Sequence, residues 1–314
     1  MQPFHPLIRN PHLLTIFGNF ARRTLDTVQF PIDEQLIETE PGIQILVHSQ
    51  RPAGEVRGEL ILLHGLEGSS NAGYLRSMAQ LALTNGYAVH RTNMRSCGGT
   101  DEHCRTMYHA GLTSDTLAIV RRVRSQTNVP LFLGGYSLGG NVVLKLAGEL
   151  GEGARGLLAG VVAVSTPIDL AACVRALSRN GNRLYEWRFV RALKARIRRR
   201  GGSADKLRRI RTVYEFDDAF VAPFFGFGTA DRYYATQSAI NFLPEIRVPT
   251  LLVQAKDDPM IPFDIFSDPR LQQNPNIRLL AVEHGGHLGF IASAAPQFWV
   301  DRVILNWIAE IGNK

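Results

Sequence analysis

Short apolar runs of strand length alternate along the chain with segments whose apolar residues recur at helical spacing. The apolar runs lie at 59–63, 87–92, 131–134, 157–164, 250–254 and 277–282. Helical patterns lie at 71–85, 112–125, 139–149 and 296–311, with a short helix or turn at 264–266. Two further runs, 35–38 and 43–48, flank a Pro-Gly pair and predict an antiparallel hairpin. The alternation predicts a mostly parallel sheet with crossover helices on its faces.

The alternation breaks between Pro167 and about Tyr234. This stretch contains helical segments, including 184–197, but no convincing core strand. The simplest arrangement is one α/β core made of residues 1–166 and 235–314, whose first 29 residues form an N-terminal arm. Residues 167–234 are then a helical, Arg-rich cap inserted after a strand. A chain of 314 residues, 45% of them hydrophobic, is large enough to bury such a core.

Composition narrows the class of protein. Charged residues make up 20% of the chain, which is typical of a globular protein. No apolar stretch approaches the roughly 18 residues that a membrane-spanning helix requires. Prolines and polar residues interrupt the first 20 positions, so no signal-peptide core is present and we expect a cytoplasmic protein. Cys97, Cys104 and Cys173 form no CxxC pair, and we expect free thiols.

A Gly-x-Ser-x-Gly pattern places Ser137 between the apolar run 131–134 and a helical run. So sharp a turn strains the serine backbone, and a Cβ atom at Gly135 or Gly139 would clash with the neighbouring strand or helix. The turn lifts the hydroxyl clear of the sheet and directs the helix N-terminus at it. The alternative is an ordinary glycine-rich turn, because Gly and Ser are common. Its position between a strand and a helix makes Ser137 the candidate nucleophile.

Two histidines follow the last predicted strand, and His287 is the preferred general base. A base must take the proton of the serine hydroxyl and later return it to the leaving group. Gly285 and Gly286 let the loop before His287 fold tightly over the carboxyl edge of the sheet, where Ser137 is expected. His284 lies nearer the end of the strand and is interpreted as a structural histidine.

Asp257 and Asp258 end the preceding strand, where a carboxylate can accept a hydrogen bond from histidine Nδ1. Asp258 is preferred because the acid of this arrangement usually stands four residues before a proline, here Pro262. Asp257 is then a turn or helix-capping carboxylate. Asp169 is a weaker candidate for the acid, since a helix N-cap explains it. The order Ser, Asp, His along the chain is the one that α/β-hydrolases use.

The loop at 64–68 follows the first buried strand of the core. In enzymes of this order, one backbone N–H of the oxyanion hole comes from this loop and the other from the residue after the nucleophile. That assigns the oxyanion hole to the N–H groups of Leu66 and Leu138. His64 is interpreted as a brace of the loop rather than as a second base.

Together these segments carry a family resemblance. The chain resembles the YheT-like branch of the α/β-hydrolases, the fourth AB-hydrolase family, over nearly its whole length. The matching stretches, besides the loops of Asp258 and His287, are NPHLLTI at 10–16, HGLEGSS at 64–70, RSCGGT at 95–100, YHAG at 108–111, GYSLGGN at 135–141 and FDD at 216–218. Ser96 departs from the family pattern, which has glycine there, and this puts details of the substrate in doubt.

The resemblance implies the α/β-hydrolase fold, a triad of Ser137, Asp258 and His287, and hydrolysis of carboxylic esters with short- to medium-chain or lipid-like acyl groups. Two alternatives stay open. One is an acyltransferase that uses the same triad with an alcohol as acceptor. The other is a membrane-surface binding protein with a vestigial hydrolase site. We expect no cofactor and no metal, because no metal-ligand spacing and no phosphate-binding loop is present.

The net charge of +7 comes from one segment. Residues 175–211 contain 14 Lys and Arg but only two acidic residues, so the rest of the chain is acidic overall. Apolar residues at helical spacing are interleaved with these arginines, which allows three interpretations. The segment is either a cap helix with a solvated outer face or an amphipathic helix that contacts anionic membranes. In the third interpretation, its positive charge attracts an anionic substrate. No groove-reading motif accompanies the charge, so nucleic acid is not expected.

An aromatic cluster follows the basic segment. It either lines an acyl pocket or packs the cap on the core. Its members are Phe220, Phe224, Phe225, Phe227, Tyr233 and Tyr234.

Overall fold

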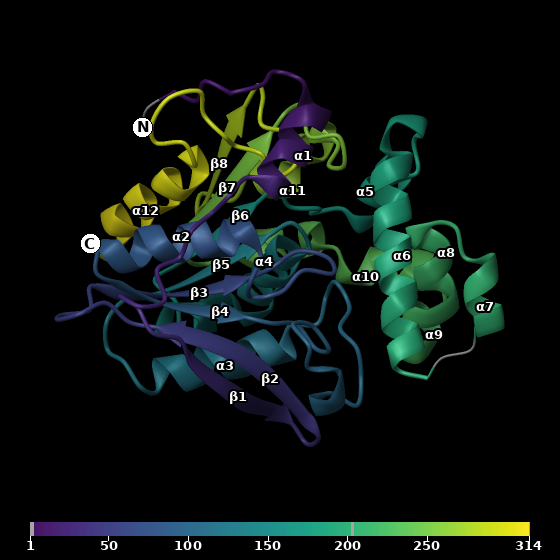
Figure 1. The fold of residues 1–314 in the computed structure, drawn as a ribbon, viewed down its shortest axis with the longest axis horizontal. Helices are drawn as coiled ribbons and strands as arrows, with labels where there is room; N and C mark the ends of the chain where they lie inside the picture. Colours follow the sequence, from purple (N-terminus) through teal and green to yellow (C-terminus); the bar gives the residue numbers. More distant parts are fainter. Residues whose placement is uncertain (1–2, 202–203, 314) are drawn as a thin grey trace.

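The computed structural model describes residues 3–201 and 204–313, which build an eight-stranded sheet with helices on both faces (Figure 1). The strands are β1 (Asp33–Glu40), β2 (Ile43–Gln50), β3 (Gly58–Leu63), β4 (Tyr87–Thr92), β5 (Leu131–Tyr136), β6 (Gly160–Val164), β7 (Thr250–Ala255) and β8 (Ile277–Val282). Their order in the sheet is β1-β2-β4-β3-β5-β6-β7-β8. β1 and β2 pair antiparallel, as do β2 and β4, and the other neighbours are parallel. The predicted hairpin and the mostly parallel sheet are confirmed.

Side chains alternate between the two faces of the sheet, and each face has its own core. Leu60 and Leu62 of β3 pack with α2 (Gly73–Thr84) and α12 (Trp299–Gly312). Ile61 and Leu63 point to the other face, towards α3 (Ser114–Arg124) and α4 (Leu138–Leu150). Every residue of β3 to β7 is buried, which explains why most residues of these strands are apolar.

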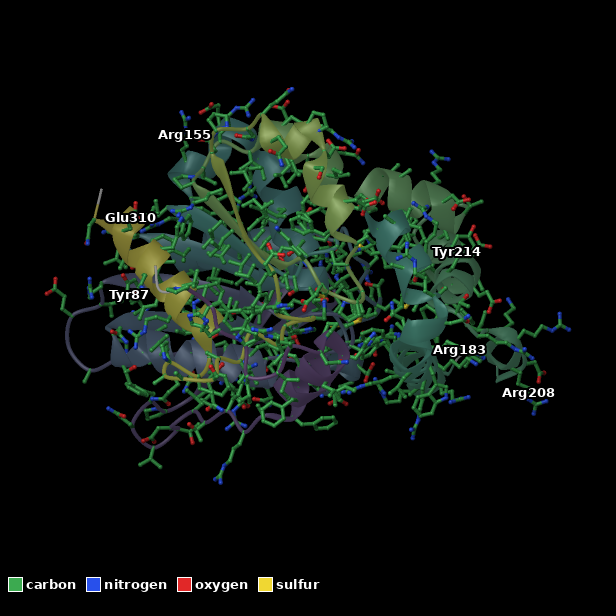
Figure 2. All side chains as sticks on the ribbon, turned by 90° about the horizontal axis from the view of Figure 1, so that it is seen from above. Tyr87, Arg155, Arg183, Arg208, Tyr214 and Glu310 are labelled. Carbon is green, nitrogen blue, oxygen red and sulfur yellow. The ribbon has the colours of Figure 1, made fainter. Side chains whose placement is uncertain are left out.

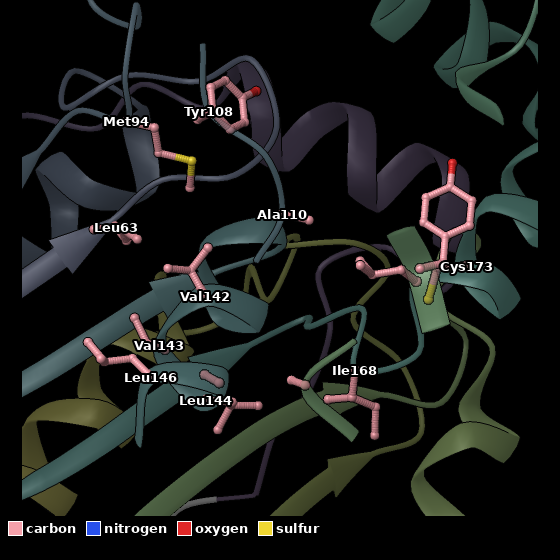
Figure 3. Packing of buried hydrophobic residues seen from close by; sticks show 14 of the residues in the cluster. Leu63, Met94, Tyr108, Ala110, Val142, Val143, Leu144, Leu146, Ile168 and Cys173 are labelled. Carbon is pink, nitrogen blue, oxygen red and sulfur yellow. The ribbon is translucent and has the colours of Figure 1, made fainter. Parts of the chain in front are cut away.

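The chain between β6 and β7 forms only helices in its described part, and these lie beside the sheet (Figure 1). Besides three short 3-10 turns, they are α5 (Leu170–Leu177), α6 (Arg183–Arg199), α7 (Ala204–Arg209), α8 (Val213–Phe216), a π-helical turn (Asp217–Val221), α9 (Ala222–Phe224) and α10 (Ala230–Gln237). The apolar core continues into them without a break. Figure 3 shows part of this cluster, from Leu63 and Met94 at the sheet to Cys173 on α5.

Two details differ from the sequence-based prediction. The strand predicted at 157–164 begins only at Gly160, because the N–H groups of Leu157 and Leu158 both bond to the Ala154 carbonyl and close a helical turn. The N-terminal arm contains a helix, α1 (Pro11–Phe20), that was not predicted. The short α11 (Pro269–Gln272) precedes β8. Throughout the described residues, no helix has both the length and the apolar character needed to cross a membrane.

Candidate active site

Ser137 stands at the tight turn between β5 and α4. Its backbone has φ +52°, in the left-handed region that non-glycine residues rarely adopt. A Cβ atom on Gly135 would lie 2.2 Å from the Gly139 carbonyl oxygen, and one on Gly139 would lie 2.5 Å from the carbonyl oxygen of His64. Only glycine fits at both places, as the sequence pattern predicts. The strained turn holds the Ser137 hydroxyl above the carboxyl ends of the parallel strands.

His287 connects Ser137 to Asp258, although 150 residues separate the serine from the histidine. The imidazole Nε2 lies 3.0 Å from Ser137 Oγ, and Nδ1 lies 2.9 Å from Asp258 Oδ2. These partners favour the tautomer in which Nδ1–H donates to the carboxylate and Nε2 accepts from the hydroxyl. The structure therefore brings together the three side chains that the sequence singled out.

The Asp258 carboxylate is fully buried and held on both oxygens. Oδ1 accepts hydrogen bonds from the backbone N–H groups of Met260 and Ile261, at 2.9 and 3.1 Å. Oδ2 accepts from His287 and from the Gln254 amide. Several donors aimed at one carboxylate fix its orientation. Asp258 can thus keep the imidazole in place without moving itself.

The two rival residues pair with each other instead. His284 Nδ1 lies 3.1 Å from Asp257 Oδ2, and the Gly286 N–H donates to Asp257 Oδ1. This second pair is partly exposed and joins the loop after β7 to the loop after β8. Asp169, the third candidate acid, caps the N-terminus of α5 by accepting from the Ala172 N–H.

The sequence did not identify the support of the His287 loop, which comes from α1. The Thr15 hydroxyl accepts a hydrogen bond from the His287 backbone N–H at 2.8 Å and donates to the Pro11 carbonyl. The fit is close, since a Cβ atom on Gly286 would lie 2.5 Å from Thr15 Oγ1. Thr15 belongs to the NPHLLTI stretch, which contributed to the family resemblance but had no role assigned.

The loop after β3 is braced as the sequence predicts. His64 is buried, donates from Nδ1 to the Gly65 carbonyl and accepts at Nε2 from the Met94 N–H. Burial lowers its pKa to about 4, so it is neutral at physiological pH. His64 therefore acts as a structural support.

The N–H groups on either side of Leu66 are occupied by tyrosine hydroxyls: Gly65 donates to Tyr74 and Glu67 to Tyr108. For the N–H groups of Leu66 and Leu138, no acceptor is found within the described residues. Both leucines line the same cavity as Ser137. Two free backbone donors beside the serine are what an oxyanion hole requires.

The cavity lies between the core and the inserted helices and is mostly apolar. The core contributes Ser137, His287 and the segments 66–67, 107–110 and 260–261, and the inserted helices contribute α5, α6 and the segment 213–221. Of the predicted aromatic cluster, Tyr233 and Tyr234 line it, whereas Phe224 is 55% exposed. Phe225 and Phe227 pack against the His109 ring. The cluster therefore serves both of the roles considered, through different members.

The basic segment is divided between two environments. Arg196 of α6 is buried and touches the loops that carry Glu67 and Ser96. Figure 2 shows Arg183 and Arg208 at the outside of the inserted helices, remote from Tyr87 on β4. The predicted apolar stripe of α6 is also divided, because Leu184 is 62% exposed whereas Leu193 is buried.

Ser96, where the sequence departs from the family pattern, has φ +59°. This left-handed backbone is the conformation that glycine adopts without strain, which explains the family preference. The Ser96 hydroxyl donates to the Thr106 carbonyl at 3.1 Å and accepts from Arg200. These contacts hold the serine in a conformation that costs it about 1 kcal/mol or more.

Comparison with known proteins agrees with this fold. Residues 60–302 match a family described as "Alpha/beta hydrolase family". The chain is 31% identical to "Putative esterase YheT" of Escherichia coli K12, over 95% of this chain and 90% of that protein. It is 28% identical to the mouse protein "Phospholipase ABHD3", over 98% of this chain and 80% of that one. The solved structure of the Pyrococcus furiosus esterase Pf2001 resembles it in fold, with a TM-score of 0.63, 18% identity and coverage of 92% and 98%.

Proposed function

The chain belongs to the alpha/beta hydrolase family, and we propose that, as a carboxylic ester hydrolase, it uses Ser137, His287 and Asp258 as its catalytic triad. One observation carries the proposal: two consecutive hydrogen bonds run from the Ser137 hydroxyl through the His287 imidazole to the Asp258 carboxylate. The names of two relatives, an esterase and a phospholipase, support ester hydrolysis.

The chemistry proceeds in two halves. Ser137 Oγ attacks the ester carbonyl carbon while His287 Nε2 takes its proton, and the carbonyl electron pair moves to the oxygen. The N–H groups of Leu66 and Leu138 bind this oxyanion, and Asp258 stabilises the imidazolium. The tetrahedral intermediate then breaks its bond to the alcohol oxygen, which receives the proton from His287. Water repeats the sequence on the acyl-enzyme, releases the acid and restores the Ser137 hydroxyl.

The apolar cavity supports an aliphatic substrate. Its lining includes Leu170, Val174, Leu193 and Phe216, and no exposed cation lines it. An alkyl chain that leaves water for such a site gains about 0.8 kcal/mol per buried CH₂ group. We therefore expect esters with short- to medium-chain or lipid-like acyl groups to be preferred over small polar esters.

Labelling with a fluorophosphonate tests the nucleophile. The wild-type protein should be labelled, and Ser137→Ala should not be. A panel of p-nitrophenyl esters of increasing acyl length then measures turnover. Labelling that persists in Ser137→Ala, or no turnover at any chain length, would contradict the proposal.

Because Asp257 and Asp258 are adjacent, the same substitution at each position tests which of them is the acid of the triad. Asp258→Asn should lower kcat by a factor of about 10⁴, the loss seen when the acid of such a triad is replaced by its amide. Asp257→Asn should leave kcat within a few-fold of wild type, because Asp257 contacts His284 and Gly286 rather than His287. Equal losses in both variants would overturn the assignment of the acid.

A further inference from the structure

Two acidic residues, Glu67 and Asp217, line this mostly apolar cavity, and Glu67 is paired with Arg196. Asp217 lies in the π-helical turn Asp217–Val221 and lines the same cavity as Ser137 and His287. Its residue is only 9% exposed. A π-turn widens a helix by one residue and occurs often at functional sites, because it redirects a side chain that an α-helix would place elsewhere.

The Asp217 carboxyl is only half satisfied. Oδ2 accepts a hydrogen bond from the Tyr234 hydroxyl at 2.7 Å. Within the described part of the chain, no group donates to Oδ1, and no Lys or Arg forms an ion pair with this residue. Burial without a cation raises the pKa of Asp217 from 3.8 to about 7. Oδ1 is not one of the fully buried side-chain atoms that lack a partner, so it is accessible, and a substrate bound in the cavity can donate a hydrogen bond to it.

The adjacent carboxylate, Asp218, has a structural role. Asp218 is exposed, and its Oδ1 accepts a hydrogen bond from the backbone N–H of Ala230 at the start of α10. That contact stabilises the start of α10 and accounts for the position of the Asp218 side chain. Asp218 therefore has a structural contact, whereas Asp217 lines the cavity and has one oxygen without a hydrogen-bond donor.

The surroundings restrict the chemistry of the missing partner. A plain alkyl chain would leave Oδ1 unsatisfied. An ammonium group would have to lose its own hydration in an apolar cavity, which costs several kcal/mol. A hydroxyl group is neutral and both donates and accepts, so it can bond to Asp217 in either protonation state.

We propose that Asp217 is a specificity-determining residue that binds a hydroxyl group on the aliphatic chain of the ester substrate. The ligand class is therefore an ester whose acyl or alkyl chain carries a hydroxyl some carbons away from the scissile carbonyl. The hydroxyl hydrogen-bonds to Asp217 Oδ1 while Tyr234 holds Oδ2. This inference rests on the proposed function, since it assumes that the cavity receives the ester chain.

Matched substrates test it. Two series of esters would be compared, each with and without a terminal hydroxyl over a range of chain lengths. One consists of p-nitrophenyl alkanoates and ω-hydroxyalkanoates, the other of alkyl acetates and diol monoacetates. In at least one series, wild type should show a kcat/KM about tenfold higher for the hydroxylated member at one or more lengths. Asp217→Leu should abolish or reverse that preference, whereas Asp217→Asn should keep part of it.

Asp218→Asn is the control, because it changes the adjacent carboxylate outside the cavity, and it should keep the wild-type preference. A preference for plain chains at every length in wild type would overturn the inference while leaving ester hydrolysis intact. The same holds if Asp217→Leu, folded by circular dichroism, keeps the preference for hydroxylated chains.

A binding measurement separates this result from a failure of the proposed chemistry. Calorimetry with Ser137→Ala would compare 1,n-alkanediols with n-alkanols of the same length. Tighter binding of the diol, lost in the Ser137→Ala, Asp217→Leu double variant, supports the subsite even if no ester is hydrolysed. Equal binding of diol and alkanol at all lengths contradicts it.

Discussion

Arg196 of α6 and Glu67 of the loop after β3 form a buried ion pair, with Nε 2.9 Å from Oε1 and side chains only 4% and 10% exposed. The pair connects the inserted helices directly to the loop that contains Leu66. Glu67 itself has φ +54°, and its backbone N–H and its carboxylate both bond to the Tyr108 hydroxyl. The shape of the proposed oxyanion hole therefore depends on a side chain from the insertion.

Replacing Arg196 by Met should lower both stability and catalysis. Removing one partner of a buried pair costs about 3–5 kcal/mol, because the other charge stays buried without compensation. The free Glu67 carboxylate should also disturb the loop and reduce kcat more than it changes KM. Thermal unfolding and ester kinetics would measure the two effects. Arg199, on the same helix as Arg196, forms a partly exposed pair with Asp101, and Arg199→Met is the control that should change either quantity only slightly.

Thr15→Val should slow catalysis, although Thr15 contacts no substrate. The variant keeps the shape of the side chain but removes the acceptor of the His287 N–H, which costs about 1–3 kcal/mol for an unpaired buried donor. We expect kcat to fall about tenfold or more with little change in KM, because His287 is misplaced and the cavity is not. Thr15→Ser, which retains the hydroxyl, should restore most of the rate. A rise in KM with kcat unchanged would contradict this positioning role.

Asp217 should make the protein less stable as pH rises through neutrality. Its folded pKa of about 7 lies above the unfolded value of 3.8, so the folded state binds the proton more tightly. The resulting stabilisation is complete below pH 3.8 and is lost as pH rises towards 7. Between pH 5 and pH 8 the loss should be about 3 kcal/mol. Denaturant unfolding at several pH values would measure it.

Asp217→Asn provides the comparison for that titration. Asp301, whose pKa burial raises to about 6, contributes a change of the same sign in both proteins. The difference between wild type and Asp217→Asn therefore isolates Asp217. Identical pH dependence in the two proteins would mean that Asp217 ionises normally in the folded state.

We expect the membrane contact that the sequence predicts to include the exposed apolar face of α1. Leu13, Phe17 and Phe20 are exposed on one side of this helix. Its N-terminal turn adjoins α6, because the His12 ring stacks on Tyr185 with 5.8 Å between ring centroids.

On α6, the exposed Leu184 and Trp187 stand among exposed arginines that include Arg183 and Arg188. Apolar side chains flanked by cations suit an anionic bilayer surface. We expect binding to vesicles that contain phosphatidylglycerol, weakened by salt, and much less to pure phosphatidylcholine.

Sedimentation with vesicles would measure this binding. The Phe17→Ala, Trp187→Ala double variant should bind less, whereas Val28→Ser, which changes an exposed residue outside these two helices, should bind as wild type does. Equal affinity for neutral and anionic vesicles would contradict an electrostatic contribution. A double variant that binds like wild type would show that these helices are not the contact.

Much of the core was predictable because it depends on local pattern. Strands β4 and β8 were predicted with their observed bounds, since each is a run of strand length bounded by turn residues. The turn at Ser137 was equally predictable, because its two glycines answer steric demands from nearby backbone. Helix α1 was missed: its buried residues, such as Leu14, pack on a loop more than 270 residues away, and no local pattern announces that contact.

The sequence by itself determined the types of side chain available and their order along the chain: a serine on a tight turn, then an acid, then a histidine. Only the tertiary structure decided which carboxylate meets His287, because Asp257 and Asp258 are adjacent and point to different partners. It also decided that Arg196 is buried while its neighbours are solvated, and that Asp217 faces the cavity while Asp218 caps a helix. The physical reason is the same in each case. Periodicity and spacing record what a residue needs from its neighbours in sequence, whereas burial and pairing depend on distant segments that meet only in the folded chain.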